Sequence, residues 1–118
     1  MVKYQWKIYL VNLDPVIGSE QGKTRPVLII SDDNINKIMP IINILPITSK
    51  KINRTVYPNE VLIRQGIGGL DKDSIILSHQ IKTIDKRRLI KEIGEIRDEK
   101  LKEEIFQSIL FQIGYYSD

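Results

Sequence analysis

At 118 residues, with 42% hydrophobic and 28% charged residues, the chain has the size and composition of one globular domain covering residues 1–118. It contains no cysteine, which excludes a disulfide framework, a thiolate metal site and a cysteine nucleophile. His79 is the only histidine, so any metal site falls to carboxylates, and a zinc enzyme is not expected.

The charge and hydropathy patterns bear on partners and location. The formal net charge of +3 permits a polyanionic partner without demanding one. No apolar run approaches the roughly 20 residues of a membrane span, and the first ten residues, MVKYQWKIYL, lack the uninterrupted apolar region of a signal peptide. We therefore expect a cytoplasmic protein that does not associate with membranes.

The first part of the chain is predicted to form short strands separated by turn signals. Lys7–Asn12 is a first strand ended by Asp14-Pro15, and a glycine-containing loop over residues 16–24 follows it. Pro26 then opens a second strand. Further strands are predicted over Ile41–Thr48, where Pro46 indicates an edge or a bulge, Glu60–Ile63, and Ser74–Ser78, the last continuing toward Thr83.

The end of the chain changes from strand to helix periodicity. Asp85 can cap a short turn through Leu89, a last strand covers Ile90–Ile96, and Asp98 begins a helix. This order favours an α+β fold that is mainly β: a small, strongly bent antiparallel sheet or barrel with a C-terminal amphipathic helix. The apolar stripe of that helix is Leu101, Ile105, Ile109 and Ile113, with Leu110 alongside.

The segment GSEQGKTRPVLIIS, residues 18–31, joins a polar loop to an apolar strand. The loop side chains suit either an ordinary surface connection or a base-reading loop. Arg25 directly precedes Pro26, so its guanidinium can be held ready for a phosphate with little loss of entropy, or can form an internal salt bridge.

Thr48 ends the third predicted strand, in PITSK. A threonine at this place is usually structural, capping a turn. If the sheet brings it beside Arg25, however, a hydroxyl and a guanidinium can orient one phosphodiester and neutralise the charge that develops as a ribose 2′-hydroxyl attacks phosphorus. This reaction needs neither a metal nor a cysteine, and it excludes DNA, which has no 2′-hydroxyl.

His79 and Gln80 follow the fifth predicted strand. The histidine can act as acid or base, or it can be an ordinary surface residue with satisfied hydrogen bonds. Gln80 can bond a base edge or the backbone. Residues 66–69 lack the strand-to-helix setting of a phosphate cradle and are predicted to form a turn, and the basic cluster at residues 86–88 is interpreted as a solvated face.

Together these segments closely resemble the MazF/PemK family of toxin endoribonucleases from bacterial toxin–antitoxin pairs. The resemblance covers residues 7–113 in order, through IYLVNLDP, GSEQGKTRPVLIIS, ILPITSK, LDKDSIILSHQIKTIDKRRL and the final helix. The most specific motifs are GSEQG-x-x-RPVL and QI-x-T-x-DK-x-RL.

The resemblance implies a homodimer of SH3-like barrels that cuts single-stranded RNA, chiefly messenger RNA, leaving 2′,3′-cyclic phosphate and 5′-hydroxyl ends without any cofactor. It also implies a cognate antitoxin with an acidic disordered segment. The family's catalytic arginine and threonine fall on Arg25 and Thr48. Candidate RNA contacts are Ser19, Glu20, Gln21, His79 and Gln80.

Two features of the sequence depart from the family pattern. Trp6-Lys7 stands where Gly-Asp is frequent, and His79 stands where an acidic residue is common. The second change falls where a substrate base is expected, so the cut-site preference of relatives does not transfer to this chain.

Two other functions compete with RNA cleavage. The gyrase poison CcdB resembles this family in fold and acts by protein contact alone, although a poison has no need of the Arg25–Thr48 pair. An inactive regulatory module would bind RNA without cutting it.

Overall fold

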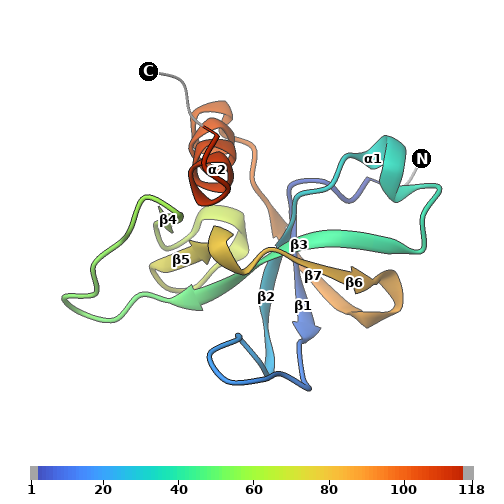
Figure 1. Ribbon diagram of the computed structural model, residues 1–118, viewed down its shortest axis with the longest axis horizontal. Helices are drawn as coiled ribbons and strands as arrows, with labels where there is room; N and C mark the ends of the chain where they lie inside the picture. Colours follow the sequence, from blue (N-terminus) through green and yellow to red (C-terminus); the bar gives the residue numbers. More distant parts are fainter. Residues whose placement is uncertain (1–2, 116–118) are drawn as a thin grey trace.

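In the computed structural model, which describes residues 3–115, seven strands form one strongly bent antiparallel sheet that packs against a C-terminal helix (Figure 1). The helices are α1 (Asp33–Asn36) and α2 (Glu99–Gln112), and the 3₁₀ turns are η1 (Ile67–Gly69), η2 (Ser78–Gln80) and η3 (Lys86–Arg88). The strands are β1 (Lys7–Asn12), β2 (Thr24–Ile29), β3 (Ile41–Ser49), β4 (Glu60–Ile63), β5 (Ser74–Leu77), β6 (Lys82–Asp85) and β7 (Leu89–Glu95).

The predicted α+β class with a C-terminal helix is therefore confirmed. The strand order is β4-β5-β3-β2-β1-β7, with β6 also paired to β3, and within residues 3–115 this path does not close on itself. No helix in that range is long and apolar enough to span a membrane.

Strand β3 organises the sheet because it pairs with three different strands along its length. Residues 41–44 pair with β6, residues 44–46 with β2, and residues 47–49 with β5. In Figure 1, β3 runs across the molecule from β6 at one end to β5 at the other. The bend of the sheet lies where these partners change.

Both strand prolines lie where the pairing changes. Pro46 is the last residue of β3 paired with β2, directly before Ile47 joins β5. Pro26 lies inside β2 rather than opening it, because the strand begins at Thr24. Since the β2–β3 register begins at Val27, the missing N–H of Pro26 interrupts no residue pair with β3.

The predicted continuation of the fifth strand toward Thr83 is interrupted. β5 ends at Leu77, the turn η2 breaks the strand, and β6 then runs in the same direction along β3 and pairs with its opposite end. Hydrogen bonds from η2 to three other segments hold this break, and the local sequence does not reveal them. The short helix α1 was also not predicted, although Asp32 caps it by accepting from the N–H of Asn34.

The helix signals are confirmed at the N-terminus of α2 and in most of its stripe. The Asp98 carboxylate accepts from the Lys100 N–H, and Leu101 and Ile105 are buried in the main core, with Ile109 packed against it. The prediction for Ile113 is wrong: it is the C-terminal cap and is 69% exposed. Asp85 caps η3 as expected.

A buried carboxylate ties the loop between β3 and β4 to the sheet. The Glu60 side chain is only 3% exposed and receives two hydrogen bonds from Arg54, of 2.9 and 2.8 Å, and one of 3.1 Å from the Tyr57 N–H. The Arg54 guanidinium, aided by His79 and by the Tyr57 N–H, outweighs burial and lowers the pKa of Glu60 to about 2.

Replacing Ile105 by alanine is expected to lower the free energy of unfolding by about 2–5 kcal/mol, because the cavity would lie between α2 and the sheet. Ile113→Ala removes the same atoms from the exposed C-terminal cap of α2 and should change the free energy of unfolding by less than about 0.5 kcal/mol. Urea denaturation checks both values. Equal losses in the two variants would mean that α2 packs differently.

Because the pKa of Glu60 is lowered from its ordinary value of 4.5, the ionised carboxylate stabilises the folded state above pH 4.5. That stabilisation is lost as the pH falls toward 2. The stability difference between the wild type and Glu60→Gln should therefore shrink by on the order of 2–3 kcal/mol over that window. Urea denaturation at a series of pH values measures it. A difference that does not vary with pH would contradict the ion pair.

Candidate active site

Arg25 and Thr48 lie on neighbouring strands and line one hollow of about 360 Å³. Val27 of β2 pairs with Pro46 of β3, and Arg25 and Thr48 each lie two residues farther along the same end of these antiparallel strands. Alternation along the two strands therefore places both side chains on one face. The sheet brings the guanidinium and the hydroxyl together, as the catalytic hypothesis requires.

The Arg25 side chain is partly held and partly available. Its Nε–H donates to the Gly22 carbonyl at 2.7 Å, which ties the base of the guanidinium to the loop. Among the described residues, its terminal nitrogens have no hydrogen bond and no ion pair, so the internal salt bridge considered above is absent there. The fork of donors that suits a phosphate is therefore uncommitted on a residue that lines the hollow.

The three hollows around these residues adjoin one another. A second hollow, of about 390 Å³, shares Thr48, Ser49 and Lys51 with the first. A third, of about 450 Å³, shares Gln21, His79 and Gln80 with the second. We call these three adjoining hollows the groove. All seven predicted site residues border it: Ser19, Glu20, Gln21, Arg25, Thr48, His79 and Gln80.

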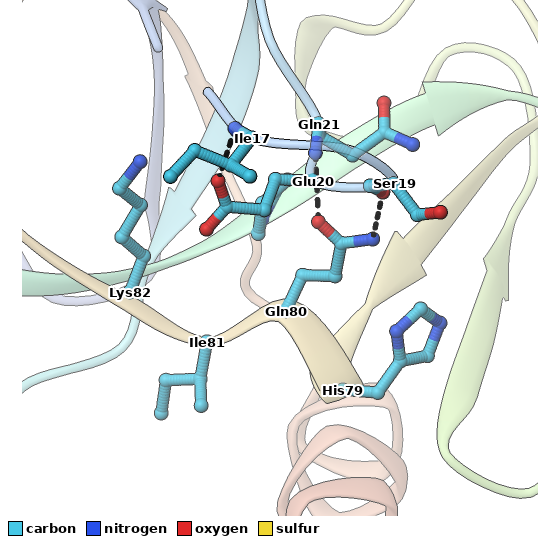
Figure 2. Close-up of a pocket in the computed structure, with 9 residues that line it drawn as sticks. Ile17, Ser19, Glu20, Gln21, His79, Gln80, Ile81 and Lys82 are labelled. Atoms are coloured by element: carbon cyan, nitrogen blue, oxygen red, sulfur yellow. Dashed lines mark hydrogen bonds between the residues drawn. The ribbon is translucent and has the colours of Figure 1, made fainter. Parts of the chain in front are cut away.

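The loop between β1 and β2 roofs the third hollow, and its own bonds shape it (Figure 2). Glu20 accepts from the Ile17 N–H at 2.6 Å and so closes a tight turn. Gln80 accepts from the Gln21 N–H at 2.8 Å and donates to the Ser19 carbonyl at 3.2 Å. Of the two readings offered for Gln80, the structure shows the backbone contact.

The three residues of η2 bond three different parts of the fold. The Ser78 hydroxyl lies 2.6 Å from that of Ser108 on α2, and both are buried. His79 Nε2 lies 2.9 Å from Glu60 Oε2 at the start of β4, and Gln80 holds the β1–β2 loop. The turn thus fixes His79 and Gln80 at the wall of the groove.

Sequence reasoning missed several charged groups in the groove. Lys51, Lys72 and Lys82 line its hollows, and Arg54 lies there bonded to Glu60. Of these residues, only Lys51 could have been found from the sequence, because it follows Thr48 closely in the chain. These cations outnumber the acidic groups Glu20 and Asp71 and favour a polyanion. Within residues 3–115, no three His, Asp or Glu side chains cluster as a metal site would require.

Comparisons with known proteins identify the family of the chain. Residues 4–108 match the family model described as PemK-like, MazF-like toxin of type II toxin–antitoxin system. The chain is 46% identical over 96 residues to the endoribonuclease MazF of Staphylococcus saprophyticus, an alignment covering 81% of this chain and 79% of that protein.

Solved structures share the fold at lower identity. A mycobacterial endoribonuclease, solved in complex with its cognate antitoxin, superimposes with a TM-score of 0.80 at 17% identity over 99% of this chain and all of that one. MazF from Deinococcus radiodurans gives 0.79 at 23% identity, over 97% of this chain and 98% of that one. The resemblance noted in the sequence is thus confirmed, and the chain belongs to the family of PemK-like and MazF-like toxins of type II toxin–antitoxin systems.

Proposed function

We propose that this protein is a toxin endoribonuclease that cleaves single-stranded RNA, chiefly messenger RNA, at short sequences in the cytoplasm. The observation that carries the proposal is the shared hollow of Arg25 and Thr48 within a cationic groove. The 46% identical relative is itself an endoribonuclease, which supports the same activity here. The gyrase-poison alternative is not favoured, because family model and relative both belong to MazF-like toxins.

The proposed reaction is attack of a ribose 2′-hydroxyl on the adjacent phosphorus. It leaves a 2′,3′-cyclic phosphate and a 5′-hydroxyl and requires no metal. The terminal nitrogens of Arg25 would donate to the phosphate oxygens and stabilise the charge that grows on them in the transition state. The Thr48 hydroxyl would orient the same phosphate. Arg25 is not assigned as general base, since a guanidinium stays protonated in proteins.

Along the groove, the proposal places RNA bases beside the β1–β2 loop and η2. Ser19, Glu20, Gln21, His79 and Gln80 border that part. Lys51, Lys72 and Lys82 would contact phosphates on either side of the cut, a contribution that depends on salt but not on sequence.

We also propose that a cognate antitoxin silences the toxin through this groove. An acidic segment that is disordered when free would match the cationic lining and would compete with RNA for it. The mycobacterial relative was solved with its own antitoxin, which supports such a partner.

Arg25→Ala is expected to lower the rate of RNA cleavage by at least about 100-fold, the scale for losing one preorganised electrostatic stabiliser. Arg25→Lys should rescue little, because an ammonium cannot reproduce the guanidinium fork. Cleavage of a labelled single-stranded RNA measures both.

The matched control is Arg87→Ala, which removes the same group from a largely exposed arginine paired with Asp85. It should cut at a rate near that of the wild type. Near-normal cutting by a folded Arg25→Ala variant would remove Arg25 from the site.

The protein is expected to be a homodimer. Ile17 in the β1–β2 loop and Ile52 in the β3–β4 loop are 84% and 91% exposed, and a second copy would cover such apolar side chains. Light scattering at micromolar concentration should give twice the mass of the chain. A fully active monomer would contradict this expectation.

A further inference from the structure

The contact between His79 and Glu60 defines which ring nitrogen of the histidine carries a proton. His79 Nε2 lies 2.9 Å from Glu60 Oε2, and the same oxygen receives Arg54 Nη2–H at 2.8 Å. The other oxygen, Oε1, receives Arg54 Nη1–H and the Tyr57 N–H. With three donors already on it and a pKa near 2, this carboxyl is ionised and can only accept. Nε2 must therefore carry a hydrogen.

The second nitrogen, Nδ1, is then left as a hydrogen-bond acceptor when the ring is neutral. It makes no hydrogen bond to the residues that the structure describes. The ring is 27% exposed and borders the groove, where Figure 2 shows it beside Gln80 and the loop of Ser19 and Gln21. The Gln80 amide is already bonded to that loop, so His79 offers an uncommitted polar atom at this wall.

We propose that Glu60 is a positioning residue that makes His79 a hydrogen-bond acceptor toward an RNA base, and that this selects adenine and cytosine, which carry an amino group at purine C6 or pyrimidine C4, over guanine and uracil, which carry a carbonyl there. Adenine N6 and cytosine N4 can donate to Nδ1, whereas guanine O6 and uracil O4 at the corresponding positions cannot. The inference rests on the proposed function, since it names the base preference of the same groove. Glu60 lies on β4 and contacts His79, so it would set this preference through the histidine without touching the base itself.

Substituting Glu60 by glutamine should reverse the tautomer. With its oxygen at the Oε1 position, the glutamine amide keeps the bonds from Tyr57 and Arg54 Nη1, and its NH₂ group faces one other donor, Arg54 Nη2. In the flipped amide the NH₂ group would face two other donors, so the first orientation is preferred. Its NH₂ group then donates to His79 Nε2, the ring proton moves to Nδ1, and His79 becomes a donor toward the base.

The tautomer can be read directly because His79 is the only histidine in the chain. In protein labelled with ¹⁵N-histidine, NMR at a pH where the spectrum shows the ring to be neutral should give a protonated Nε2 and an unprotonated Nδ1 in the wild type, and the reverse in Glu60→Gln. Glu92→Gln, the same change on β7 at a carboxylate bonded to Lys7, should leave the wild-type pattern. A wild-type ring protonated on Nδ1 would overturn the inference.

The base preference is measured on a pool of single-stranded RNAs that carry all four bases at every position around the cut. Sequenced products of the wild type should show one position where adenine and cytosine exceed guanine and uracil by about tenfold. Glu60→Gln should reverse that preference, and Glu92→Gln should keep it. Replacing adenosine at that position by purine riboside removes the amino group and should slow cleavage by the wild type about tenfold.

Each outcome decides a different point. If no position favours adenine and cytosine over guanine and uracil, or if a folded Glu60→Gln variant keeps the preference, the inference falls while the nuclease activity stands. If the wild type cuts no RNA, the proposed function falls and the base selection with it, whatever the NMR shows. If Glu60→Gln fails to fold, the wild-type tautomer and the purine riboside substrate still decide.

Discussion

The partner exchange along β3 is the constraint on which the rest of the structure depends. Its nine residues pair in turn with β6, β2 and β5, which bends the sheet and delivers Thr48 to the hollow that Arg25 enters from β2. Both catalytic candidates therefore stand on strands whose register is set by buried apolar neighbours such as Leu28 and Leu45. In the proposed mechanism, this rigidity would hold a guanidinium and a hydroxyl ready for one phosphate before any substrate arrives.

The turn η2 connects the rigid sheet to the variable parts of the groove. Ser78 bonds α2, His79 bonds β4, and Gln80 bonds the β1–β2 loop, so consecutive residues tie three segments to one point. The proposed chemistry at Arg25 and the proposed base contacts would thus be supported by different elements. Under that proposal, exchanges around η2 would alter the choice of base without moving Arg25 or Thr48.

Much of the fold could be predicted because local signals were strong. The Asp98 cap, the Leu101–Ile105 stripe and strand Glu60–Ile63 follow from periodicity and capping chemistry alone. The end of β5 at Leu77 could not, since the hydrogen bonds of η2, which interrupts the strand, come from segments distant in the sequence. For the candidate site, Arg25 and Thr48 were predicted from their motifs, and the structure brings both to one hollow. Glu60 was missed because nothing local marks a strand glutamate as the partner of a histidine 19 residues away.

The most direct test of the catalytic account is the chemistry of the cut ends. Single-stranded RNA incubated with the purified protein in the presence of a chelator should be cut at discrete positions, leaving 2′,3′-cyclic phosphate and 5′-hydroxyl ends. An otherwise identical RNA with a 2′-deoxynucleotide directly before the cut should remain intact there, because the attacking hydroxyl is gone. Cleavage of that deoxy-substituted position, or products with 5′-phosphate ends, would contradict a 2′-hydroxyl attack assisted by Arg25 and Thr48.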